Sequence, residues 1–148
     1  MDPYRHILCA TDLSADSSPA CGRAAAVARC FDARLTLLHV VEFFPEDRSN
    51  DDIAPEDVDP REYAERRARE RLAALAHDAG CADAELVVRF ASQSAWHEIL
   101  DHAGAEGADL IVVSEHEHGG LKALVPTTAR QLSARHASDV LVVPAAAS

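Results

Sequence analysis

The sequence predicts an α/β fold with a doubly wound, five-stranded parallel sheet and helices on both faces. Short apolar runs of strand length alternate with longer segments of helical periodicity. The runs are apolar throughout, as in strands that are covered on both sides. The longest run, Leu35 to Val41, is too short to span a bilayer. With 148 residues and 48% hydrophobic residues, the chain suits a single domain, 1–148, with a core of its own.

The first half of the chain begins with a strand at residues 6–10, followed by a polar break at 11–14. Ser18 before Pro19 is typical of a helix start, with serine as the N-cap and proline in the first turn. Residues 35–41 form the second strand. One face of the helix between them is apolar at i, i+3, i+4 and i+7: Ala24, Val27, Ala28 and Phe31.

The second half repeats this alternation. A helix is expected over 60–79, closed by Gly80. Ser94 is expected to cap a further helix, which buries Trp96, Ile99, Leu100 and Ala103. The remaining elements are strands at 85–90, 110–113 and 140–144 and a helix at 127–136.

Charge and cysteine content narrow the class of protein. The net charge of −11 argues against nucleic acid and anionic membranes as partners. Much of it lies in an acidic loop at about residues 43–60, expected to be solvated. No charged-then-apolar leader opens the sequence, so a cytoplasmic location is expected. The cysteines form no Cys-x-x-Cys pair and are interpreted as small buried residues: Cys9, Cys21, Cys30 and Cys81.

The fold also predicts where a ligand would bind. In doubly wound sheets, ligands lie at the carboxyl ends of the strands, where the strand order reverses. Here these ends are Thr11 and Asp12, Val40 and Val41, Ala91 and Ser92, and Ser114. Asp12 has two readings: its carboxylate accepts hydrogen bonds from a ribose hydroxyl or an adenine amine, or it caps the turn after the strand. His39, inside a strand, is expected to be a hydrogen-bonded core residue.

Three segments carry a resemblance to a known family. They are His6-Ile7-Leu8-Cys9-Ala10-Thr11-Asp12-Leu13-Ser14, Leu38-His39-Val40, and the stretch from Leu110 through His116-Glu117-His118-Gly119-Gly120 to Val143-Pro144. Together they resemble the universal stress protein family, and the resemblance covers essentially the whole chain. We expect the strand order 3-2-1-4-5 and a core that includes Ile7, Leu8, Leu37, Val88, Ile111, Val112 and Leu141.

The resemblance implies a degenerate nucleotide site. ATP-binding members of that family carry Gly-x-x-Gly, nine residues, then Gly-Ser or Gly-Thr. On this chain the three glycine positions fall on Ser114, Glu117 and Thr127, and only the final hydroxyl is kept, by Thr128. Side chains there block the close approach of backbone N–H groups to phosphate, and Glu117 adds a repelling carboxylate. The site, where one is retained, would consist of Ala10, Thr11, Asp12, Val40, Val113, Ser114, Glu117, Thr127 and Thr128.

The pattern Thr127-Thr128-Ala129-Arg130-Gln131-Leu132 looks like the universal stress protein A branch, which implies a stress-responsive, cytoplasmic, dimeric binding protein without ATP or another cofactor. The alternative is a nucleotide-binding switch that retains weak AMP, ADP or ATP binding. A third candidate is an enzyme such as a slow nucleotide hydrolase. The sequence offers no catalytic residues for it, so no enzyme activity is expected.

Two further features concern partners and metals. An apolar edge strand tends to pair with its own copy, which predicts a homodimer through Val140, Leu141, Val142 and Val143. His116 and His118 have the i, i+2 spacing of zinc ligands, but the sequence supplies no residue to complete a metal site, and a polar loop tip is the competing interpretation. The stress, the pathway and any protein partner are left open by the sequence.

Overall fold

The computed structural model describes residues 3–14, 17–42, 56–92, 94–115 and 138–144. Within them, strands and helices alternate up to the fourth strand, as the sequence predicts. The elements are β1 (His6–Thr11), α1 (Ser18–Phe31), β2 (Arg34–Val41), α2 (Pro60–Asp78), β3 (Glu85–Phe90), α3 (Ala95–Glu106), β4 (Leu110–Glu115) and β5 (Asp139–Pro144). The helix predicted at 127–136 lies outside the described residues.

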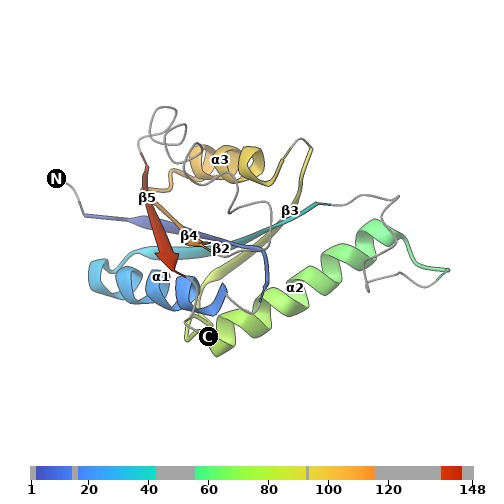
Figure 1. Cartoon of the computed structure of the whole chain (residues 1–148), viewed down its shortest axis with the longest axis horizontal. Coiled ribbons are helices and arrows are strands. Elements are labelled where there is room, and N and C mark those ends of the chain that lie inside the picture. The colour runs from blue at the N-terminus through green and yellow to red at the C-terminus, as the bar shows by residue number, and fades with distance from the viewer. Residues whose placement is uncertain (1–2, 15–16, 43–55, 93, 116–137, 145–148) are drawn as a thin grey trace.

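The strands form one five-stranded sheet in the order β3-β2-β1-β4-β5, with every neighbouring pair parallel. This confirms the predicted order. Cys9 of β1 lies between Leu37 of β2 and Val112 of β4. Helices α1 and α2 cover one face of the sheet and α3 covers the other (Figure 1). The strand order reverses between β1 and β4: the chain runs from β1 outward to β2 and β3, and then returns to β4 on the other side of β1. At such a reversal a doubly wound sheet forms its ligand crevice.

The sheet divides the core into two layers because successive strand residues point to opposite faces. Ile7, Cys9 and Leu37 pack under α1 and α2, whereas Leu8 and Leu38 pack under α3. Five of the seven predicted core residues are fully buried: Ile7, Leu8, Leu37, Ile111 and Val112.

The other two, Val88 and Leu141, are only half-buried, so this part of the prediction is wrong. They lie on β3 and β5, the edge strands, which have a neighbouring strand on one side only. The four residues predicted for the inner face of α3 are all buried: Trp96, Ile99, Leu100 and Ala103.

The helix ends follow local hydrogen bonding. Ser94 Oγ accepts from the backbone N–H of His97 at 3.2 Å, as predicted for an N-cap. At α1, however, the residue before the helix is Ser17, not Ser18. Ser17 makes no side-chain cap, because its hydroxyl donates to Asp12 instead. Gly80 and Gly107 follow α2 and α3 with φ of +77° and +68°, a backbone conformation that favours glycine.

Two residues of α1 are more exposed than the sequence pattern suggests. Phe31, placed on the apolar stripe, is 43% exposed and packs its ring edge-on against Tyr4. Cys30 is also exposed, whereas the other three cysteines are buried free thiols. Cys9 Sγ and Cys21 Sγ lie 3.8 Å apart, and burial raises the pKa of Cys81 to about 11.

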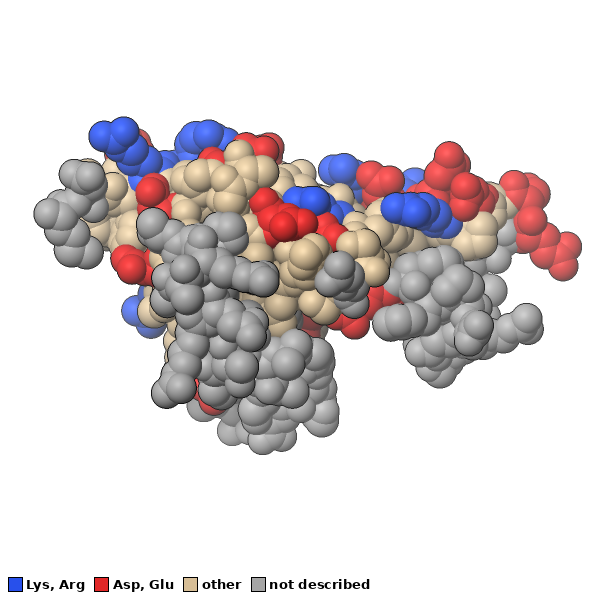
Figure 2. All heavy atoms as spheres, turned by 90° about the horizontal axis from the view of Figure 1, so that it is seen from above, with Lys and Arg blue, Asp and Glu red and all other residues tan. Residues whose placement is uncertain are grey.

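Part of the predicted acidic loop is visible. Figure 2 shows acidic side chains gathered at the end of the molecule where α2 begins. Glu56, Asp57 and Asp59 are exposed there, and the Asp59 carboxylate accepts from the backbone N–H of Arg61 at 2.9 Å. The rest of the loop, 43–55, lies outside the described residues. None of the helices that the structure describes is long and apolar enough to cross a membrane.

Candidate functional site

The candidate site lies at the carboxyl ends of the central strands, where β1 is flanked by β2 and β4. Ala10, Val40 and Val113 point to the α3 face there and belong to one buried cluster. They are 2%, 8% and 0% exposed, so they form an apolar floor rather than a polar surface. The structure therefore brings three of the predicted site residues together.

The loop after β1 is held by its own polar groups. Thr11 Oγ1 accepts from the backbone N–H of Leu13 at 3.0 Å. Asp12 Oδ1 accepts from the backbone N–H of Ser14 at 2.9 Å and from Ser17 Oγ at 3.0 Å. Leu13, between them, has φ of +64°, which is uncommon for a residue with a side chain. These bonds offset the cost of that conformation and fix the shape of the loop.

This geometry bears on the two readings of Asp12. One carboxylate oxygen caps the turn, as the structural reading expects. Asp12 also lies at the predicted site, next to the last residue of β1. A ligand that uses Oδ1 would compete with two bonds within the protein.

His39 links β2 to the end of β1 by a hydrogen bond. Its Nδ1 donates to the carbonyl oxygen of Thr11 at 2.8 Å, and Thr11 and His39 are register partners. Burial lowers the pKa of His39, and the hydrogen bond to Thr11 opposes this shift only in part. The side chain is half-buried and hydrogen-bonded, so the prediction of a structural histidine agrees with the contacts.

Arg71 of α2 also contacts the loop after β1, and this contact was not predicted from the sequence. Its Nη2 lies 3.5 Å from the carbonyl oxygen of Leu13, and its charge also disfavours protonation of His39. The helical pattern places Arg71 on α2 but gives no sign that it reaches a loop 58 residues earlier in the chain.

A second polar network lies at the end of β3, and it too was not predicted from the sequence. Glu98 of α3 is buried, and its Oε2 lies 3.0 Å from Arg89 Nη2. Its Oε1 accepts from Ser92 Oγ at 3.0 Å. Burial, followed by the charge of Arg89, lowers the pKa of His102, whose Nδ1 lies 3.5 Å from Arg89 Nη1. Because Glu98 is ion-paired, its role here is to fix the β3-α3 turn beside the site.

The phosphate-binding segment is described only at its start. Ser114, at the first glycine position, is 4% exposed and pairs in register with Val143. The predicted site residues Glu117, Thr127 and Thr128, and the histidines His116 and His118, lie outside the described residues. Among the residues that are described, no group of three or more His, Cys, Asp or Glu could hold a metal ion.

The predicted dimer strand lies at the edge of the sheet. Val140, Leu141 and Val142 are half-buried and Val143 is buried. In the described ranges, β5 pairs with β4 alone. The homodimer predicted through this strand stays a prediction.

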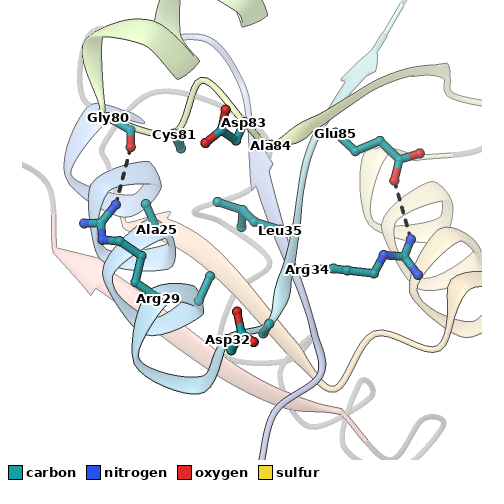
Figure 3. A pocket seen from close by; sticks show the side chains of 12 residues that line it. Ala25, Arg29, Asp32, Arg34, Leu35, Gly80, Cys81, Asp83, Ala84 and Glu85 are labelled. Atoms are coloured by element: carbon teal, nitrogen blue, oxygen red, sulfur yellow. Dashed lines mark hydrogen bonds and ion pairs between the residues drawn. The ribbon is translucent and has the colours of Figure 1, made fainter.

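A separate hollow lies at the opposite end of the sheet, where β2 and β3 begin. It has a volume of about 440 Å³ and is floored by small side chains such as Ala25 and Ala84. Figure 3 shows two contacts of the arginines that line it: Arg29 reaches the carbonyl oxygen of Gly80, and Arg34 pairs with Glu85. It contains none of the predicted site residues.

The matches to known proteins extend over nearly the whole chain. A sequence model described as the universal stress protein family matches residues 3–144. A protein of Coxiella burnetii named Universal stress protein A homolog 1 is 33% identical over 140 residues, which cover 95% of this chain and 96% of that protein.

Solved structures agree with the fold. One, described as a universal stress protein in complex with cAMP, has a TM-score of 0.65 and 21% identity, covering 97% of this chain and 98% of its own. Another, the universal stress protein from Archaeoglobus fulgidus in complex with dAMP, has a TM-score of 0.59 and 17% identity, covering 96% and 99%.

Proposed function

Since the chain belongs to the universal stress protein family, we propose that it is a stress-responsive, non-catalytic binding protein that acts as a cytoplasmic homodimer and does not hold ATP. The observation that carries the proposal is which side chains occupy the candidate site at the carboxyl ends of the central strands. Its one described glycine position is occupied by the buried Ser114, and the carboxylate of Asp12 already caps the loop.

The missing glycines bear most strongly on the triphosphate. By the family motif, Glu117 and Thr127 replace glycines whose N–H groups approach phosphate closely. A carboxylate about 4 Å from a phosphate oxygen costs on the order of 1–4 kcal/mol at surface-like dielectric, a loss of tenfold or more in affinity. Together these changes should move a micromolar ATP site towards the millimolar range.

A gain-of-binding experiment tests this explanation. The double variant Glu117→Gly with Thr127→Gly should bind ATP measurably more tightly than the wild type, and adding Ser114→Gly should strengthen binding further. A matched control, Glu115→Gly, removes a carboxylate from the same segment without restoring a motif glycine. If the double variant binds no better than this control, the glycine explanation fails.

The proposed homodimer rests on the edge strand β5. Its residues Val140 to Val143 are apolar and include no charge, and pairing two copies about a two-fold axis would cover the strand edge. Protein concentrations in the micromolar range should therefore give a dimer in sedimentation.

A nucleotide-binding switch is the second candidate. It is favoured by the two similar structures in complex with cAMP and dAMP, both of which carry a single phosphate. A monophosphate carries less negative charge than ATP, so the carboxylate of Glu117 repels it less strongly. Mass spectrometry of the small molecules that co-purify with the native protein separates the two candidates: an adenine mononucleotide supports the switch, and its absence supports the first proposal.

A further inference from the structure

Two buried thiols are in contact between β1 and α1. Cys9 Sγ donates a hydrogen bond to Cys21 Sγ at 3.8 Å, and neither side chain is exposed. The sulfurs of a disulfide are about 2.05 Å apart, so these two would have to approach by a little less than about 2 Å. That is the scale of a change in side-chain torsion, and the cluster around the pair includes side chains as small as Ala20 and Ala24.

The two thiols differ in chemistry. Cys21 is the acceptor of the hydrogen bond, which lowers its pKa against the opposing effect of burial. It is also the fourth residue of α1, and the N-terminus of a helix favours a thiolate. Cys9 is the donor, and the same bond together with burial raises its pKa well above the ordinary value. Cys21 is therefore the nucleophile of the pair, and Cys9 holds its proton until a second step.

Two features give a small oxidant access to the pair. The hollow where β2 and β3 begin is lined by Cys81, which packs in the same buried cluster as Cys9 and Cys21 (Figure 3). Ala25, another residue of its lining, lies one helical turn after Cys21 on the same face of α1. In addition, Ser17 gives α1 no side-chain cap, so the first turn of this helix opens at lower cost than a capped one.

We propose that Cys9 and Cys21 form a peroxide-reactive dithiol, which a hydroperoxide converts into a disulfide. The Cys21 thiolate attacks one peroxide oxygen and breaks the O–O bond, which leaves Cys21 as a sulfenic acid and releases hydroxide. Cys9 sulfur then displaces the hydroxyl group from Cys21 sulfur, and the Cys9 proton leaves with it as water. In sum, two thiols are oxidised to one disulfide while one hydrogen peroxide is reduced to two waters. This activity does not depend on nucleotide binding.

A tryptic digest reads out the reaction directly. Cleavage after Arg5 and Arg23 leaves Cys9 and Cys21 on one peptide, residues 6–23, whereas Cys30 and Cys81 fall on other peptides. The full chain is treated with hydrogen peroxide, unfolded, alkylated with iodoacetamide and digested. Peptide 6–23 should then carry no alkyl group and be lighter than the reduced, unalkylated peptide by two hydrogens, and dithiothreitol before alkylation should restore both alkyl groups. Full alkylation of this peptide while Cys30 is oxidised, or a bond from Cys21 to Cys81, would overturn the proposal.

Single variants test the two roles. In Cys9→Ala the sulfenic acid of Cys21 has no thiol beside it to form the disulfide, so peptide 6–23 should gain two oxygens as a sulfinic acid. In Cys21→Ala the remaining Cys9 should stay reduced and be alkylated. Cys81→Ala is the matched control, because it removes a third buried thiol from the same cluster and should leave the disulfide intact. Oxidation of Cys9 in the Cys21→Ala variant would contradict the assignment of the nucleophile. The digest of the unmodified chain decides the proposal even where a buried variant fails to fold.

The bond would also change the loop after β1. A disulfide from Cys9 to Cys21 closes a ring of chain that contains Asp12 and Leu13, and so restricts this loop in the unfolded protein. The oxidised protein should therefore melt about 5–10 °C above the reduced one, and dithiothreitol should reverse the difference. A lower Tm after oxidation would show that the bond does not fit the native arrangement of β1 and α1, and would overturn the proposal.

Discussion

Replacing Asp12 by alanine should destabilise the protein even when no ligand is present. The substitution removes the acceptor for Ser14 N–H and for Ser17 Oγ, and with it the support for the left-handed backbone at Leu13. Hydrogen bonds to a charged group contribute about 1.5–3 kcal/mol each, but Asp12 is half-exposed, so water replaces part of what is lost. We therefore expect a loss of about 2 kcal/mol in the free energy of unfolding.

Urea denaturation followed by Trp96 fluorescence measures this loss. The protein concentration is kept fixed because the proposed dimerisation would raise apparent stability. In a thermal scan, about 2 kcal/mol corresponds to a fall in Tm of roughly 4–8 °C for a chain of this size. Asp12→Asn keeps an oxygen in place as a neutral acceptor and should cost about 1 kcal/mol or less.

Glu115→Ala is the matched control, since Glu115 is an exposed acid at the end of a neighbouring strand. It should change stability by no more than about 0.5 kcal/mol. If Asp12→Ala proves as stable as the wild type, the carboxylate does not hold the loop. The reading of Asp12 as a residue kept for a ligand would then be the better one.

Three more predictions follow from single residues. Val142→Lys places a charge on the edge of β5 and should convert dimers into monomers or aggregates in sedimentation; an unchanged dimer would refute pairing through this strand. Burial holds the pKa of His39 below its ordinary 6.5, so the unfolded chain takes up the proton first and stability should fall as the pH drops below about 6.5. His39→Gln should flatten that slope in urea denaturations at a series of pH values, and an unchanged slope would refute the contribution of His39. Iodoacetamide should label the exposed Cys30 before Cys81, whose pKa of about 11 leaves little thiolate; mass spectrometry of labelled peptides would show the reverse order if this is wrong.

The strand order and most of the core were predictable because both follow from hydrophobic pattern and family resemblance. Residues such as Ile7 and Ile111 lie in apolar runs of the central strands, where both neighbours and both faces are covered. The pattern of Val88 and Leu141 is the same, but they lie on edge strands. Apolar periodicity alone does not distinguish an edge strand from a central one. The predicted strand order does place β3 and β5 at the edges, so the expectation that Val88 and Leu141 are buried gave too much weight to the apolar pattern.

The grouping of three candidate-site residues was predictable from the sequence, but the contacts around them were not. The carboxyl ends of parallel strands meet at one edge of the sheet, which is why Ala10, Val40 and Val113 were expected together. The contacts of Arg71 with the β1-α1 loop and of Glu98 with Arg89 depend on how helices pack on the sheet. Such long-range pairs leave no spacing signal in the sequence.

The measurement that bears most directly on the proposed function is a calorimetric titration of the unmodified protein with ATP at physiological salt. If Ser114, Glu117 and Thr127 prevent the close approach of backbone N–H groups to the triphosphate, no binding heat should be detected up to the millimolar range. A saturable isotherm with a micromolar Kd would contradict the proposal, and would show that the chain holds ATP without the glycines of the motif.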